Sequence, residues 1–250
     1  MVHPPPAEII DGCKTFIPLE NNPDVLKTLC NNLRVAPGLQ FIDIVSLSPD
    51  DLRQYSTTPC RALIVLAETA IFSHARPTKG LPIPEYQGSG PEEPVLWMKQ
   101  TINHACGLMA LLHVLFNVHD SRYVVPGTPL EELRQQAVAL GPDARARLLY
   151  ESAFLEKAHM DAASRGSSRV PSPREDNQHH FMAFVQKDSR VWELNGGLPG
   201  PFLRGTIEMR EGLLSEKGLR LTVQEFLAAA EQTGHSEMSI VAVIEDADAA

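Results

Sequence analysis

Residues 100–116 read QTINHACGLMALLHVLF, and this stretch decides the fold. It begins polar and is almost wholly apolar from Cys106 onward, so a helix here has no polar stripe. A helix that is apolar all round is buried on most of its surface. We therefore predict a buried helix over residues 106–117, in mid-chain, against which the other elements pack.

Cys106 lies in the first turn of this predicted helix. There the unpaired backbone N–H groups and the positive end of the helix dipole favour a thiolate, which is the reactive form of cysteine. The position is suitable for a nucleophile. A free cysteine is also commonly a small buried hydrophobe, and position alone leaves both interpretations open.

Four stretches of the chain resemble the ubiquitin C-terminal hydrolases, a papain-like family of cysteine peptidases. The sequence around Cys106 is similar to the active-site motif of that family. The other three are FIPLENNPDVL (residues 16–26), QFIDIVSLSPDDL (residues 40–52) and HFMAFVQKDSRVWELNGGLPGP (residues 180–201). They follow the family order and together span most of residues 15–245, which makes the combination more specific than any single motif.

The composition fits a globular protein with a substantial core. The 250 residues are 43% hydrophobic and 21% charged, which allows one large domain or two small ones. No apolar run approaches the roughly 20 residues that span a bilayer, and the N-terminus lacks the features of a secretory signal. The four cysteines, Cys13, Cys30, Cys60 and Cys106, have no paired metal spacing. We expect reduced thiols in a cytoplasmic or nuclear protein.

The net charge of −9 disfavours a nucleic-acid partner and suits either simple solubility or a partner with a basic surface. The resemblance implies such a partner, ubiquitin or a ubiquitin-like protein, bound through its C-terminal tail, which carries arginines and ends in two glycines. We expect a monomer that binds no membrane and needs no cofactor. His104, Cys106 and His179 supply no tetrahedral metal-ligand set at the usual spacing.

Capping signals and apolar periodicity place the remaining elements. They predict helices over residues 23–33, from 48, from 128, over 141–163 and over 222–232, and strands over 41–47, 62–67, 181–186, 191–194 and 238–244. Residues 1–14 are expected to be loosely held, residues 73–94 to form a surface loop, and residues 246–250 an acidic tail. The polar stretch 164–178 predicts a loop that is functional or disordered.

These elements indicate one mixed α/β domain with its sheet between helices. The resemblance implies a papain-like fold, with a central, mainly antiparallel sheet and a threaded backbone. It also implies that residues 15–245 form the catalytic domain and that residues 164–178 cross over the active site.

A cysteine peptidase needs a thiolate, an imidazole, a group that orients the imidazole, and donors for the oxyanion. Cys106 is the predicted nucleophile. The resemblance selects His180 as the general acid and base, although a lone histidine here could simply cap a strand; His179 should point to the opposite face. Gln100 matches the oxyanion glutamine of the family and would act together with the backbone N–H of Cys106; otherwise it is a surface glutamine.

The position of the orienting group departs from the family pattern, which has aspartate before glycine where this chain has Asn195. An asparagine carbonyl can accept a hydrogen bond from the imidazole Nδ1–H. It carries no charge and stabilises an imidazolium less, but papain-like enzymes do use Cys-His-Asn. We therefore expect Asn195 to orient the histidine of an active enzyme.

The predicted function is a thiol-dependent deubiquitinase. It would hydrolyse small adducts or short peptides from the C-terminal glycine of ubiquitin, or of a ubiquitin-like protein, through an acyl-enzyme on Cys106. The alternative is a catalytically weak or inactive ubiquitin-binding relative, because Asn195 replaces the family aspartate. A third interpretation, which ignores the resemblance, is a small-molecule thiol hydrolase or acyltransferase, and the residues alone do not exclude it.

Overall fold

A computed structural model describes residues 6–55, 59–75, 84–167, 171–175 and 177–246. Its elements, in chain order, are β1 (Glu8–Ile10), β2 (Cys13–Thr15), α1 (Pro23–Asn32), β3 (Leu39–Asp43), α2 (Pro49–Leu52), η1 (Arg53–Tyr55), β4 (Ala62–Glu68), α3 (Thr69–His74), α4 (Cys106–Asn117), η2 (Val118–Ser121), α5 (Pro129–Ala139), α6 (Pro142–Glu151), α7 (Ala153–Ala163), β5 (His179–Lys187), β6 (Arg190–Leu194), β7 (Phe202–Thr206), α8 (Glu216–Leu221), α9 (Gln224–Thr233) and β8 (Met238–Glu245).

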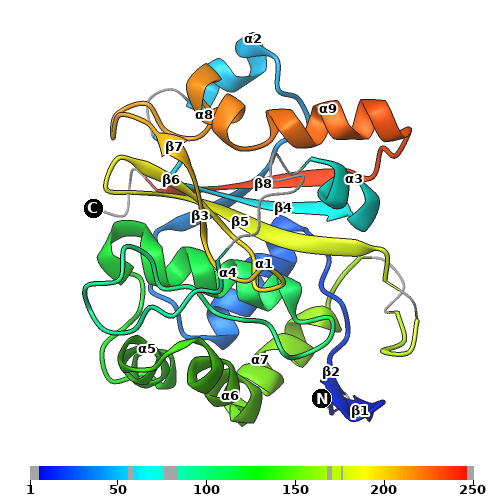
Figure 1. The fold of residues 1–250 in the computed structure, drawn as a ribbon, viewed down its shortest axis with the longest axis vertical. Coiled ribbons are helices and arrows are strands. Elements are labelled where there is room, and N and C mark those ends of the chain that lie inside the picture. Colours follow the sequence, from blue (N-terminus) through cyan, green and yellow to red (C-terminus); the bar gives the residue numbers. More distant parts are fainter. Residues whose placement is uncertain (1–5, 56–58, 76–83, 168–170, 176, 247–250) are drawn as a thin grey trace.

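A six-stranded sheet in the order β3-β8-β4-β5-β6-β7 divides the molecule. Each strand is antiparallel to its neighbours. Helices α2, α3, α8 and α9 cover one face, and α1, α4, α5, α6 and α7 lie on the other (Figure 1). The predicted mixed α/β domain with a mainly antiparallel sheet between helices is confirmed.

The sequence of β4 explains why both faces of the sheet are covered. Ile64 packs into the core on the α4 side, whereas Leu63 and Val65 pack into the core on the α9 side. Alternate side chains of a strand point to opposite faces, so a strand buried on both sides reads as a continuous apolar run. Every residue of α4 is buried, and this helix packs against β5, as its uniformly apolar sequence predicts.

The helix predicted over residues 141–163 is wrong in one respect, because it is two helices. Ser152 has an extended ψ of 100° and serves both as the C-cap of α6 and as the N-cap of α7. Its side chain accepts a hydrogen bond from the backbone N–H of Leu155 at 3.2 Å. The serine therefore satisfies a donor of the second helix that would otherwise lack a partner.

The strand predicted over residues 41–47 is displaced toward the N-terminus and ends at Asp43. Pairing with β8 stops at the Asp43–Val241 pair. The side chain of Val45 is 90% exposed. The alternation of apolar and polar residues continues beyond Asp43, where the chain leaves the sheet. A prediction from periodicity alone therefore placed the end of β3 too late.

The elements that were not predicted include α3, β7 and α8, and only the C-terminal end of α3 (residues 73–74) falls within the stretch expected to be a loop. The predicted capping box at Thr222 is also wrong, because Thr222 follows α8 and its hydroxyl donates to the carbonyl of Gly218 at 2.8 Å. The helix expected there begins at Gln224 as α9.

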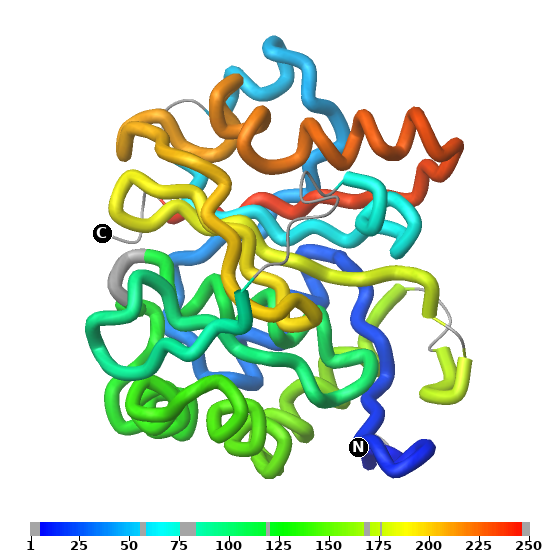
Figure 2. The backbone as a smooth tube through the Cα atoms, in the orientation of Figure 1, coloured from blue at the N-terminus to red at the C-terminus, as the bar shows by residue number. Residues whose placement is uncertain are grey.

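The N-terminal segment is a hairpin where we expected a loosely held chain. Strand β1 pairs with β2, and Lys14 of β2 forms an ion pair of 3.0 Å with Glu156 of α7. Glu8 forms an ion pair of 3.0 Å with Arg174, so the hairpin lies beside the loop that precedes β5 (Figure 2). Residues 1–5 and 168–170, Asp176, and most of the predicted acidic tail (247–250) lie outside the described residues.

Two histidines are wholly buried in the core. His113 of α4 accepts a hydrogen bond from the backbone N–H of Met98 at 3.0 Å, and His159 of α7 bonds to the carbonyl of Ile17 at 2.7 Å. Burial lowers the pKa of His113 from 6.5 to about 3 and that of His159 to about 4. Both rings are therefore neutral at neutral pH.

We predict that acid weakens the fold before the carboxylates titrate. The unfolded chain takes up protons on these histidines below about pH 6.5 while the folded chain does not, so stability is lost as the pH falls from that value toward the folded-state pKa. From pH 7.5 to 5 each histidine should cost about 2 kcal/mol of unfolding free energy. Urea denaturation will show this loss, and His113→Gln, whose amide oxygen can still accept from Met98, should reduce it. An unchanged pH dependence in His113→Gln would contradict the assignment.

Candidate active site

The four residues predicted for catalysis line a single pocket of about 360 Å³ at one end of the sheet. Its lining residues are Thr69, Phe72, Gln100, Asn103, His104, Cys106, Asn177, His179, His180, Asn195 and Gly197. Cys106 is the first residue of α4, so its backbone N–H has no partner within the helix. Its side chain reaches the pocket although the residue is only 5% exposed.

The hairpin of β5 and β6 brings His180 and Asn195 together. The register pairs Ala183 with Leu194, so Asn195 returns beside the beginning of β5. The Nε2 atom of His180 lies 2.8 Å from Oδ1 of Asn195. The ring of His180 also packs edge-on against Phe72 of α3, with 5.6 Å between ring centroids.

A second hydrogen bond fixes which ring nitrogen carries the proton. The backbone N–H of Gly197 donates to the same Oδ1 of Asn195 at 2.8 Å. A backbone N–H is always a donor, so this atom must be the amide oxygen, and His180 Nε2 must donate to it. Our expectation that Asn195 would accept from Nδ1–H is wrong, because the neutral ring is the Nε2–H tautomer and Nδ1 is its basic atom.

The amide nitrogen of Asn195 has no hydrogen-bond partner among the described residues although it is buried. The residue is 1% exposed. A buried donor without an acceptor costs about 1–3 kcal/mol. This is the place where the chain differs from the aspartate pattern, and an aspartate would leave no N–H group there.

The resting state of Cys106 also differs from the expectation of a lowered pKa. Burial raises the pKa of the thiol above its ordinary value, although backbone N–H groups of Phe181, Gly107 and Cys106 itself act in the opposite direction. The N–H groups of the helix terminus and of β5 therefore offset only part of the desolvation. Burial thus disfavours the thiolate of Cys106, and a neighbouring base would assist its formation.

Gln100 is held beside the turn that follows Asn195. Its backbone N–H donates to the carbonyl of Gly196 at 2.9 Å, and its side-chain amide donates to the carbonyl of Ile102 at 3.0 Å. A side chain at residue 196 would lie 2.8 Å from Cβ of Gln100. Glycine is therefore required at residue 196 for the two segments to approach this closely.

The other histidines have different surroundings. His113 is buried and neutral in the core. His179, expected to face away, reaches the rim of the same pocket but bonds to the carboxylate of Glu237 at 2.7 Å. His104 also lines the pocket, in a left-handed conformation with φ of 60°, and its Nδ1 has no partner among the described residues, so no orienting group for it is evident.

Sequence reasoning missed Phe72, Gly197 and Trp97 as neighbours of the site. Phe72 belongs to α3, a helix that has no capping residue from which it could be predicted. Gly197 was recognised only as part of a turn, and its donation to Asn195 depends on the fold of that turn. Trp97 bonds to the backbone of Asn195 through a contact between segments 98 residues apart.

Two features are not found in the part of the chain that the structure describes. No group of three or more histidine, cysteine, aspartate or glutamate side chains is arranged to hold a metal ion. No helix there combines the length and the apolar character needed to cross a bilayer.

The family model "Ubiquitin carboxyl-terminal hydrolase, family 1" matches residues 16–228. The chain belongs to this family. Its members are cysteine peptidases, and the chain is therefore an enzyme of that class. A ubiquitin carboxyl-terminal hydrolase of Aplysia californica is 32% identical over 194 residues, which cover 76% of this chain and 86% of the relative. The human isozyme L1 is 28% identical over 188 residues, covering 75% and 82%.

Solved structures show the same fold. The catalytic domain of Trichinella spiralis UCH37, determined with bound ubiquitin vinyl methyl ester, superposes with a TM-score of 0.67. It is 21% identical, and the match covers 92% of this chain and 96% of that one. The expected fold family is confirmed.

We predict that alkylation of Cys106 at neutral pH depends on His180. Because burial disfavours the thiolate, His180→Ala should slow the reaction with iodoacetamide at pH 7 by about tenfold. Mass spectrometry of the modified peptides measures the rate, and the exposed Cys13 is the internal reference, whose rate should not change. Equal rates for Cys106 in the two proteins would show that His180 does not serve as its base.

Proposed function

We propose that this peptidase hydrolyses ubiquitin, or a ubiquitin-like protein, at its C-terminal glycine through an acyl-enzyme on Cys106. The observation that carries the proposal is the convergence of Cys106, His180, Asn195 and Gln100 on one pocket, in a chain of the matching family. In the cytoplasm or nucleus such an enzyme would act in ubiquitin-dependent protein catabolism, where its four free cysteines stay reduced.

The proposed reaction begins with proton transfer. His180 Nδ1 accepts the proton of the Cys106 thiol, and the sulfur attacks the carbonyl carbon of the terminal glycine. The Gln100 amide and the backbone N–H of Cys106 donate to the oxyanion. The imidazolium then protonates the leaving amine, and the neutral ring activates a water molecule that hydrolyses the thioester.

Asn195 has two consequences in this mechanism. By accepting from Nε2–H it holds the productive tautomer, which is the greater part of what the aspartate of a serine triad provides. It does not supply a negative charge for the imidazolium. Because the raised pKa of Cys106 means that the imidazolium forms during the reaction, this missing charge should lower the rate.

The loop over residues 164–178 is proposed to limit the size of the leaving group. Both of its ends are held by hydrogen bonds to other segments of the chain. Ser167 donates through its backbone N–H to Glu20 at 3.1 Å, and Gln178 accepts through its carbonyl from the N–H and hydroxyl of Thr69 at 2.7 and 2.8 Å. Asn177 lines the pocket itself. A short span between fixed ends should admit small adducts and flexible peptides only.

The direct test is release of a fluorescent amine from the C-terminus of ubiquitin. We expect turnover by the wild-type protein, none by Cys106→Ala, and about a tenfold higher kcat/KM in Asn195→Asp, because the carboxylate stabilises the imidazolium and removes the unpaired donor. Gln100→Ala should lower kcat about 100-fold.

Two results would change the proposal. Activity that appears only in Asn195→Asp would identify a ubiquitin-binding relative that Asn195 has inactivated. A folded Asn195→Asp protein with no activity, beside an active wild type, would contradict the orienting role of Asn195.

Lengthening the loop should relax selectivity for the leaving group. Insertion of a Gly-Ser segment after Ser172 should speed cleavage of a folded protein fused to the C-terminus of ubiquitin and leave release of the small fluorescent amine within about twofold, because only access changes. The same segment inserted after Gly127, in the exposed turn before α5, is the matched control. No gain on the fused protein would show that the loop does not restrict access.

A further inference from the structure

A chain of buried hydrogen bonds leads from Asn195 away from the pocket. The indole Nε1–H of Trp97 donates to the backbone carbonyl of Asn195 at 3.0 Å. Trp97 is 1% exposed and lies three residues before Gln100 in the chain. The second donor to the same carbonyl is the backbone N–H of Leu198 at 3.1 Å, which belongs to the turn itself. The indole is thus a contact that fixes this turn from outside.

The backbone of Trp97 is held by a buried ion pair. Arg145 is fully buried, and it pairs with Glu93 at 2.6 Å. Its Nη1 donates to the carbonyl of Trp97 at 2.5 Å, and its other N–H groups reach the carbonyls of Ala137 and Leu140 at 2.8 and 2.7 Å. A guanidinium with so many partners is held rigidly. Arg145 therefore fixes the main chain of Trp97, and the indole of the same residue contacts Asn195.

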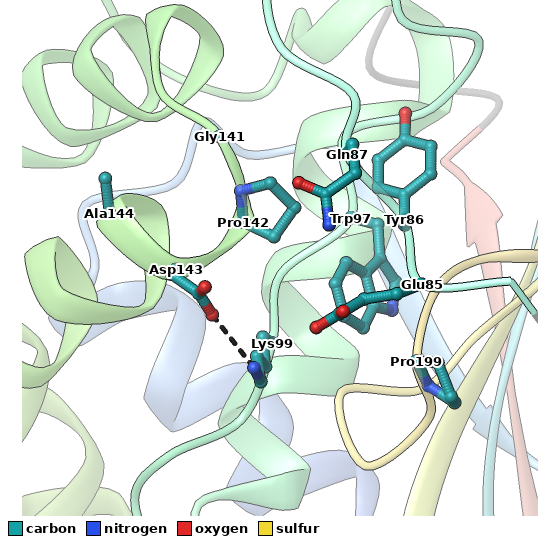
Figure 3. A pocket seen from close by; sticks show the side chains of 10 residues that line it. All are labelled: Glu85, Tyr86, Gln87, Trp97, Lys99, Gly141, Pro142, Asp143, Ala144 and Pro199. Atoms are coloured by element: carbon teal, nitrogen blue, oxygen red, sulfur yellow. Dashed lines mark hydrogen bonds and ion pairs between the residues drawn. The ribbon is translucent and has the colours of Figure 1, made fainter.

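Tyr86 holds the other side of the indole. Its ring packs edge-on against Trp97 with 6.0 Å between centroids, and its hydroxyl donates to Glu93 at 2.8 Å. Its backbone N–H donates to the carbonyl of Pro199 at 2.9 Å. Figure 3 shows Trp97, Tyr86 and Pro199 around a pocket of about 190 Å³, outside the candidate active site. The ion pair is therefore connected to both ends of the turn over residues 195–199, to Asn195 through Trp97 and to Pro199 through Tyr86.

We propose that Trp97 is a positioning residue, which acts through Asn195 to hold the catalytic His180 in its productive orientation. This inference rests on the proposed function. In this inference the buried pair of Glu93 and Arg145 takes no part in the chemistry and serves to fix Trp97.

The physical reason is the short range of the bond that Asn195 makes. The His180–Asn195 contact is 2.8 Å long, and an amide oxygen is not a strong enough acceptor to draw a displaced imidazolium back as a carboxylate would. A small displacement of the acceptor is costly in a catalytic hydrogen bond. A carboxylate would hold His180 in place by electrostatic attraction. Asn195 has no charge, so we infer that the orientation of His180 depends instead on a rigidly held Asn195 backbone.

The test is a double-mutant cycle with Trp97→Phe and Asn195→Ala. Trp97→Phe removes the indole donor and should lower kcat for ubiquitin amide hydrolysis about three- to tenfold, with KM within about twofold because Trp97 does not reach the surface. In the Asn195→Ala background the same change should have almost no further effect, since no side chain remains to be positioned. Trp192→Phe, at the other tryptophan of the chain, is the matched control and should keep the wild-type kcat.

An isosteric replacement separates the hydrogen bond from packing. In Trp192→Phe protein, Trp97 is the sole tryptophan, and incorporation of benzothienylalanine there replaces the N–H group with sulfur at nearly constant volume. The loss in kcat should match that of Trp97→Phe. Full activity of this protein, or an equal loss from Trp97→Phe in both backgrounds of the cycle, would overturn the positioning role.

Failure of the proposed function is distinguishable from failure of this inference. Turnover that survives in Cys106→Ala, or no turnover of ubiquitin by any variant, would remove the proposed function. The double-mutant cycle can then be measured without ubiquitin, by comparing the rate of Cys106 alkylation at pH 7 with that of Cys13 in each variant. Trp97→Phe should slow it about threefold, and only when Asn195 is present. Wild-type turnover that depends on Cys106, with additive losses in the cycle, would retain the function and reject the role of Trp97.

Discussion

A helix without a polar face has to be surrounded, and this constraint on α4 organises the protein. The sheet covers one side of α4 through β5, and the remaining helices of the same face complete its burial. The first turn of α4 thereby comes to the end of the sheet with Cys106 directed into a pocket. The proposed nucleophile is thus positioned by a helix whose residues are all buried.

The same burial has a chemical cost. Removing the thiol from water raises its pKa, and the helix terminus does not fully compensate. The proposed nucleophile would therefore need a neighbouring base, and the hydrogen bond from Nε2 of His180 to Asn195 leaves Nδ1 as the basic nitrogen of that ring. The backbone N–H of Gly197 settles that tautomer, since it forces the amide of Asn195 to present its oxygen to Nε2. Orientation of the base therefore depends on a turn of the main chain as much as on a side chain.

The turn over residues 195–199 connects the site to the protein interior. Gly196 allows it to lie against the Gln100 segment, Trp97 donates to its first carbonyl, and the main chain of Tyr86 donates to its last. Burial of the ion pair between Arg145 and Glu93 is tolerable because each charged group also has hydrogen-bond partners. The amide nitrogen of Asn195, by contrast, has no hydrogen-bond partner among the described residues, and it belongs to the residue that replaces the aspartate expected from the resemblance.

The sequence by itself determined the elements whose signals are local. The uniform apolar character of α4, the Asn22 cap of α1 and the two apolar runs of β5 and β6 on either side of a turn were sufficient to predict those elements. The motifs were sufficient to name Cys106, His180, Asn195 and Gln100 as candidates. It did not determine the break at Ser152, the end of β3 or the existence of β7, because these depend on where a partner strand or a capping hydrogen bond lies. Only the tertiary structure decided which nitrogen of His180 faces Asn195, which way the pKa of Cys106 shifts, and that Trp97 contacts the turn. Each of these depends on burial or on a hydrogen bond between segments far apart in the chain, and such contacts exist only after the backbone has folded.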